Sequence, residues 1–200
     1  MKNLTLILFF ISSIHSFSQR SEEYNKFIKE IKKNAKTDKN DQTVLNLLND
    51  FYNQVLQSEK GDLNADIPER LQKLYSDKNA KNLQIMSMFL AYQEYISQTV
   101  AGNKETDPNF QFNLITDLEN EVKNTYGKVP IIVNIFKAET LKLNGQSKEY
   151  TELISKSLVE FPDSIPLKVY KYLDTKDEKT KDDLVQNHPN HWMVQQFEIK

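Results

Sequence analysis

Apolar residues recur every three or four positions along almost the whole chain after residue 20, which is the spacing of one helix face. The first such set is Tyr24, Phe27, Ile28 and Ile31. The 200-residue chain holds only four glycines and six prolines, whereas the many turns of an all-β protein consume glycine. The periodicity and the composition together predict an all-α fold.

The N-terminal half of the chain divides into five expected helices. The first has Ser21 as its N-cap and ends in the polar stretch 34–40. The other four begin near Asp41, Pro68, Asn82 and Pro108. Gly61 is expected to end the second helix. The helix over residues 82–100 is apolar around most of its circumference, so we expect it at the centre of this half.

The first 18 residues have the pattern of a secretory signal peptide. Lys2 precedes an apolar run from Leu4 to Ile14, and small or polar residues follow around Ser16 and Ser18. The run is shorter than the roughly 20 apolar residues of a membrane span. We expect cleavage after Ser18, export to the periplasm or the medium of a bacterium, and no membrane segment afterwards. An uncleaved signal anchor is the alternative, and the absence of cysteine excludes lipid attachment through that residue.

Charge and size constrain the mature chain further. The formal net charge is −2, and basic and acidic residues are interspersed, whereas a nucleic-acid-binding protein shows a concentrated basic face. Residues 19–200 are long enough to bury a sizeable core, so we expect one all-helical domain or one compact repeat array.

The chain repeats itself from residue 126 onwards. Val129-Pro130 opens one expected helix and Ile165-Pro166 opens another, an offset of 36 residues between the two prolines. Offsets of this size are typical of helix-pair arrays. His188-Pro189-Asn190 echoes the earlier Phe161-Pro162-Asp163, with Trp192 in the position of Ile165, so the helix between them is expected to be short.

The segment 130–166 resembles a tetratricopeptide repeat. Ala138 fits the small-residue position of the first helix, Asn144-Gly145 the turn, and Phe161-Pro162 the end of the second helix. Ile154 and Ser157 are then expected to face inward, while Asn134 and Tyr150 depart from the family pattern. The resemblance covers about one repeat in the half 126–200. It implies antiparallel hairpins, stacked as a short tetratricopeptide-like array or as an irregular bundle, and a role in protein or peptide binding.

Three aromatic residues are the candidate partner-binding residues: Trp192, Tyr170 and Tyr172. Large aromatic side chains are the usual anchors of interfaces. Aromatic residues at helical spacing also pack into cores, and packing of Trp192 onto the preceding helix is the interpretation we favour for that residue.

Two polar stretches suggest metal binding and have simpler interpretations. His188 and His191 lie three residues apart, but two histidines are a weak metal motif and Pro189 lies between them. We interpret this stretch as a turn with Asn190 as N-cap. The charged run 174–183 lacks the glycine and the ligand order of a calcium loop, so a solvated loop and helix start is expected. No metal site and no cofactor is expected.

No nucleophile elbow, phosphate-binding glycine loop or metalloprotease motif occurs in the sequence. The preferred hypothesis is an exported, non-catalytic protein that binds a protein or peptide partner in the bacterial envelope. Two alternatives stay open at this point: an enzyme that acts on envelope polymers through carboxylates, and an accessory or immunity-type protein that blocks one target.

Overall fold

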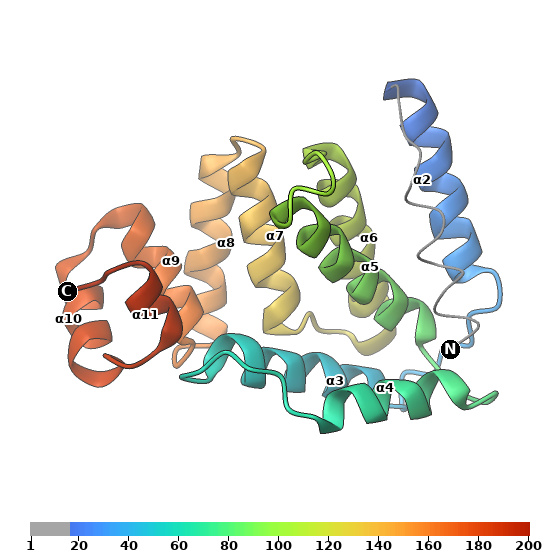
Figure 1. Ribbon diagram of the computed structural model, residues 1–200, viewed down its shortest axis with the longest axis horizontal. Coiled ribbons are helices and arrows are strands. Elements are labelled where there is room, and N and C mark those ends of the chain that lie inside the picture. Colours follow the sequence, from blue (N-terminus) through green and yellow to red (C-terminus); the bar gives the residue numbers. More distant parts are fainter. Residues whose placement is uncertain (1–16) are drawn as a thin grey trace. The chain divides into compact units, whose positions relative to one another are not determined.

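The computed structural model describes residues 17–200, and these residues form helices without a single strand (Figure 1). The all-α fold class is confirmed. The predicted signal peptide, residues 1–18, lies outside the described residues except for its last two positions.

The first described helix, α2, spans Phe17–Lys32, so the prediction that Ser21 caps it is wrong. No glycine or proline stops the helix between Phe17 and Ser21, and the helical backbone therefore continues through Ser21. The helix ends just before the polar stretch 34–40, as expected.

The chain divides into two compact units, which are described separately below. Unit 1 holds the residues up to Val44 together with Pro68–Gly127, and unit 2 holds Leu45–Ile67 together with Lys128–Lys200. The boundaries fall inside α3, Thr43–Phe51, and inside α4, Asp66–Ser76. A single domain from residue 19 to residue 200 stays a prediction.

Helix α5, Leu83–Val100, forms the interior of unit 1. It packs against α2 and against α6, Pro108–Tyr126 (Figure 1). Nine of its side chains are buried, among them Met86, Phe89 and Tyr92, which confirms the central position expected for this segment. An aromatic ring cluster joins the three helices: the Phe110 ring lies 4.8 Å from that of Tyr95 and 5.7 Å from that of Tyr24.

Helix α6 begins at Pro108, as predicted, because two local features fix its N-terminus. The side chain of Asp107 accepts hydrogen bonds from the backbone N–H groups of Asn109 and Phe110. Proline is tolerated in the first turn because its missing N–H would have no helical partner there. Gly127 ends the helix with a φ of +74°.

Asn82 holds the loop before α5 together with the loop before α3. The residue is fully buried and has a left-handed φ of 61°. Its side-chain nitrogen donates to the carbonyl oxygens of Asp38 at 2.8 Å and Asp41 at 3.2 Å, and to the hydroxyl of Tyr126 at 2.8 Å. Its side-chain oxygen accepts from the backbone N–H of Asp38 at 2.9 Å. A single amide therefore satisfies several polar groups that the loop would otherwise leave unpaired.

The C-terminal part of unit 2 is a series of short helices, which begins with α7, Ile131–Leu143, α8, Ser147–Glu160, α9, Ile165–Thr175, and α10, Glu178–Asn187. Helix α7 packs against α8, α8 against α9 and α9 against α10, while α11, Trp192–Gln196, packs against α9 (Figure 1). The turn at Gly145, which has a φ of +71°, lies between α7 and α8 as predicted.

The repeat in unit 2 has a different register from the one that the prolines suggest. Helices α7 and α9 begin at Ile131 and Ile165, 34 positions apart, and their N-caps are Pro130 and Ser164. Pro166 lies two residues further, inside the first turn, so the alignment of the two prolines is wrong by two residues. Proline is accepted at either position because neither needs a backbone donor, and it therefore does not fix the register.

Residues 45–67 contribute a helix to unit 2 that the sequence did not connect with the C-terminal hairpins. Helix α3 continues into a π-helix, Tyr52–Gln57, which packs against α9 and ends four residues before Gly61, the residue expected to end it. The side-chain oxygen of Gln57 accepts from the backbone N–H of Ile165 at 3.1 Å, and its nitrogen donates to the carbonyl oxygen of Asp163 at 3.0 Å. The Tyr52 hydroxyl lies 2.9 Å from that of Ser164. The π-helix thus fixes the turn that precedes α9.

Replacing Asn82 with alanine tests the role of this residue in unit 1. We expect Asn82→Ala to lower the free energy of unfolding by about 3 kcal/mol or more, because several buried polar groups lose a partner and alanine is strained at positive φ. Urea denaturation measures the change. Asn79→Ala, in the exposed loop nearby, is the control and should change the free energy by less than about 0.5 kcal/mol. Equal effects of the two substitutions would contradict the role assigned to Asn82.

Candidate partner-binding surface

The three aromatic residues singled out from the sequence all lie at the edge of one apolar cluster in unit 2. The buried members of this cluster are Ile165, Val169, Leu184, Met193, Val194 and Ile199. Tyr170, Tyr172 and Trp192 pack against it and are themselves partly exposed. We call these three side chains the aromatic rim. Their role in partner binding stays a prediction.

Tyr170 is tied to two neighbouring helices. Its hydroxyl donates a hydrogen bond to Oε1 of Glu139 on α7, and its carbonyl oxygen accepts from the hydroxyl of Tyr150 on α8 at 3.3 Å. Close by, the hydroxyl of Thr151 donates to Asp174 at 2.7 Å. A set of hydroxyl and carboxylate groups therefore links α7, α8 and α9, and we call it the tyrosine–carboxylate cluster: Glu139, Tyr150, Thr151, Tyr170 and Asp174.

Burial changes the acidity of two members of this cluster. It raises the pKa of Glu139 above the ordinary value of 4.5, and the hydrogen bond from Tyr170 opposes this rise only in part. Burial also raises the pKa of Tyr150 to about 12, and the negative charges of Asp174 and Glu139 add to the effect. Tyr150 therefore stays protonated at neutral pH, and its hydroxyl remains a donor.

The cluster gives this side of unit 2 groups that suit a polar or amphipathic partner. Asp174 and Lys176 are exposed, and the Lys176 ammonium lies 5.1 Å from the centre of the Tyr172 ring. Aromatic side chains surrounded by charges of both signs are common in protein interfaces. The hydroxyl groups of Tyr170 and Thr151 each donate to one carboxylate oxygen, on Glu139 and on Asp174 respectively.

Trp192 faces the end of the π-helix as well as the apolar cluster. Its indole N–H donates to the carbonyl oxygen of Val55 at 3.0 Å, and its backbone N–H donates to that of Glu59 at 2.9 Å. A Cβ atom at Gly61 would lie 3.0 Å from the indole ring, so glycine allows the close approach. Trp192 packs against the apolar cluster, and its polar partners come from residues 55–59 and not from the preceding helix.

The turn at residues 188–191 is confirmed, but its N-cap is His191 and not Asn190. The ring nitrogen Nδ1 of His191 accepts from the backbone N–H of Met193 at 3.2 Å. The buried ring also reaches the carbonyl oxygen of Leu56 at 3.0 Å, and this second contact favours the histidine over the exposed asparagine. That partner lies 135 residues away in the sequence, so no local pattern could show it.

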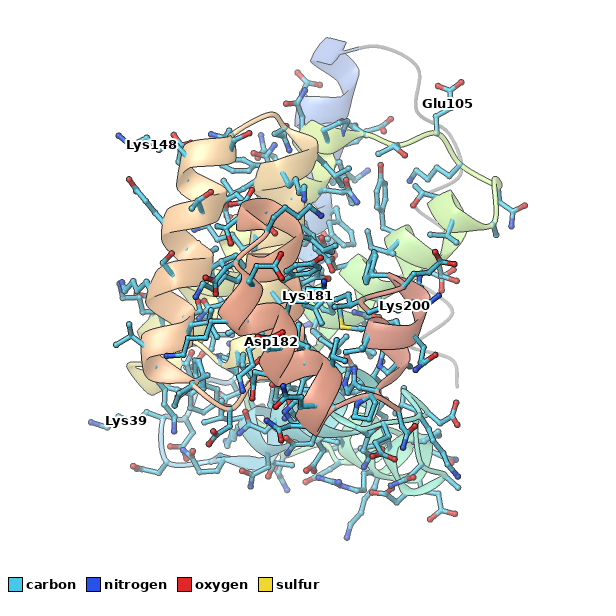
Figure 2. The ribbon with its side chains drawn as sticks, turned by 90° about the vertical axis from the view of Figure 1, so that its left-hand side faces the viewer. Lys39, Glu105, Lys148, Lys181, Asp182 and Lys200 are labelled. Carbon is cyan, nitrogen blue, oxygen red and sulfur yellow. The ribbon has the colours of Figure 1, made fainter. Side chains whose placement is uncertain are left out.

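Several carboxylates of the run 174–183 have protein partners. Asp177 caps α10 through the backbone N–H of Thr180, and Asp183 accepts from the ammonium of Lys168 at 2.6 Å. Asp182, labelled on α10 in Figure 2, is exposed. Among residues 17–200, no group of three or more histidine, aspartate or glutamate side chains is placed to hold a metal ion.

Sequence reasoning missed Glu139 and the double role of His191. Glu139 lies one position after Ala138 on a mostly apolar helix, and an acidic residue among buried neighbours was the available signal. Within the described part of the chain, no helix has both the length and the apolarity required of a membrane span.

Comparisons with known proteins found no relative of this chain. The chain matches no protein-family model, no curated protein and no solved structure. The fold and the surface described here come from the chain's own residues.

The raised pKa of Glu139 predicts a pH-dependent effect of Glu139→Gln. The fold favours the protonated carboxyl, so its contribution to stability is fully present below pH 4.5 and is lost as the pH rises through the folded-state pKa. At pH 7.5 the substitution should therefore raise the free energy of unfolding, and the gain should disappear at pH 4. Urea denaturation of both proteins at the two pH values measures this.

Glu152→Gln is the matched control for this measurement. Glu152 is an exposed glutamate on α8 whose ion pair to Lys148 spans 3.9 Å. Its substitution should give the same small difference at both pH values. A gain for Glu139→Gln that does not depend on pH would show that burial of the charge is not its cause.

Proposed function

We propose that the chain is an exported, non-catalytic helical-repeat protein that binds a protein or peptide partner in the bacterial envelope or outside the cell. The observation that carries this proposal is the arrangement of two helical hairpins in series, α7–α8 and α9–α10, whose first helices begin 34 residues apart. Tetratricopeptide repeats have this period. Proteins built from such units use the stacked helices as binding surfaces.

Local features of the first hairpin support the likeness to a tetratricopeptide repeat. Ala138 is fully buried at the small-residue position, and Ile154 and Ser157 face inward on α8 with exposed fractions of 3% and 1%. The second helix ends at Phe161, as expected. The two departures, Asn134 and Tyr150, are also buried, so this hairpin replaces an aromatic–small pair by a polar–aromatic one.

The partner surface is proposed at the aromatic rim, with Tyr172 as its most suitable anchor. The hydroxyl of Tyr170 and the indole N–H of Trp192 donate hydrogen bonds within unit 2, to Glu139 and to Val55. The ring of Tyr172 packs against the apolar cluster and lies beside Lys176. A target-blocking accessory or immunity-type protein would use such a surface in the same way. An enzyme acting on envelope polymers through carboxylates is the remaining alternative.

Affinity capture tests partner binding. The tagged full-length protein, expressed at its native level, should recover a defined partner from the envelope fraction, and Tyr172→Ala should reduce recovery at least about tenfold, the effect of losing one interface anchor. Val100→Ala, which truncates an exposed apolar side chain of unit 1, is the control and should recover the partner like wild type. Equal recovery by both variants would exclude the aromatic rim, and no recovered partner would contradict the proposed function.

Export is tested by the N-terminus of the protein isolated from the cell envelope or medium. Cleavage after Ser18 predicts that the mature chain begins at Gln19, two residues inside α2. Mass spectrometry of the intact protein measures this end. A chain that retains Met1 and cofractionates with the membrane would support the uncleaved anchor instead.

A further inference from the structure

We infer that His191 makes the attachment of residues 188–199 sensitive to pH. These residues, which we call the C-terminal latch, are held against the end of the π-helix and are released when the ring of His191 gains a second proton. This inference does not depend on the proposed function.

The two ring nitrogens of His191 have partners of opposite kind. Nε2 lies 3.0 Å from the carbonyl oxygen of Leu56, which only accepts hydrogen bonds, so Nε2 must carry the proton. Nδ1 lies 3.2 Å from the backbone nitrogen of Met193, whose N–H donates a hydrogen bond to it, so Nδ1 must be unprotonated. The hydrogen bonds therefore specify one neutral tautomer of a ring that is 1% exposed.

Protonation of Nδ1 would place two donors opposite each other at the start of α11. The hydrogen bond to Met193 would be lost, and a charge would be left in an environment that is poorly hydrated. The other contacts of the segment would remain: Nε2 still donates to Leu56, Trp192 still donates to Val55 and Glu59, and Met193, Val194 and Ile199 stay in the apolar cluster. Protonation therefore weakens the attachment of the segment and shifts its opening equilibrium. Release of the segment hydrates the charged ring and relieves this conflict.

Few charges act on His191. Those that do are His188, at the end of α10, which opposes a second positive charge, and Glu59, in the loop after the π-helix, which favours it. Ile165, Val169 and Leu184, which lie on α9 and α10, belong to the same apolar cluster as Met193 and Val194 of the latch. Burial dominates, so the pKa of His191 lies below the ordinary value of 6.5 in the closed protein. In the released segment the ring should regain that ordinary value.

The sign of the pH effect follows from this difference. The open form binds the proton more tightly than the closed form, so acidification below pH 6.5 favours opening. The opening constant, which is the equilibrium ratio of the open to the closed form, should therefore rise between pH 7.5 and pH 5.5. The rise can reach at most about tenfold, because one proton is taken up by a group with an open-state pKa near 6.5. The released segment exposes Met193, Val194 and Ile199, which belong to the apolar cluster.

Hydrogen exchange of the Trp192 and Met193 amides tests the latch, with exchange rates corrected for the intrinsic effect of pH. In the full-length protein the opening constants obtained from these two amides should rise as the pH falls from 7.5 to 5.0, while far-UV circular dichroism shows that the remaining helices persist. Opening constants that do not respond to pH in this range would overturn the inference.

Two variants assign the effect to His191. In His191→Asn the new amide oxygen can accept from the Met193 N–H as an N-cap, but the side chain does not titrate, so the opening constant should change less than about twofold over the same range. His188→Asn, the matched control, should retain the wild-type rise. A rise in His191→Asn equal to that of wild type, or its loss in His188→Asn, would overturn the assignment.

A measurement on the wild-type protein keeps the test valid if His191→Asn does not fold. Nuclear magnetic resonance follows the ring of His191 and the amide of Met193 in one pH titration. The two should change with the same midpoint, below pH 6.5. Titration of the ring without loss of protection at the Met193 amide would contradict the latch.

Discussion

The last carbonyl oxygens of a helix have no hydrogen-bond partner within the helix. In unit 2, the hydrogen bonds that supply partners for these oxygens at the end of the π-helix hold several segments together. His191 and Trp192 supply side-chain donors to Leu56 and Val55. From the other side, Gln57 and Tyr52 bind the turn that begins α9. The π-helix thereby connects the start of the second hairpin with α11.

In unit 1, a single side chain, that of Asn82, pairs with backbone groups of the loop before α3. The loops before α3 and α5 bring backbone groups into a buried region, and the amide of Asn82 supplies both the donor and the acceptor that they need. Asparagine suits this position for two reasons, since it tolerates a left-handed φ and carries both kinds of polar atom. In both units, polar side chains at helix boundaries fix the path of the chain, while the apolar helix faces supply the buried area.

The helices themselves were predictable because their signals are local. The apolar spacing located α5 and α6 to within a residue or two, and the pair Asp107-Pro108 marked the start of α6. The alignment of Pro130 with Pro166 was wrong because proline is accepted at more than one position at the start of a helix. The N-cap predicted at Ser21 was wrong because no residue between Phe17 and Ser21 stops the helix. Local patterns also could not indicate that residues 45–67 belong with the C-terminal hairpins.

The candidate surface was predictable only in part, for the same reason. Aromatic spacing identified Tyr170, Tyr172 and Trp192, and all three lie at one apolar cluster. The partners of their polar atoms could not be predicted, because Glu139 is 31 residues from Tyr170 and Val55 is 137 residues from Trp192. Which hydroxyl meets which carboxylate depends on how the helices pack, and that is a property of the whole unit.

The long sequence separation between the π-helix and α11 has a consequence for how the chain acquires its structure. During synthesis, the segment around Leu56 emerges while its partners at His191 and Trp192 are 135 or more residues from being made. Closing so large a loop is entropically costly and slow compared with forming a hairpin such as α7–α8. Unit 2 therefore cannot be completed before residues 191 and 192 have been made, and a nascent chain stopped at residue 190 would lack both donors.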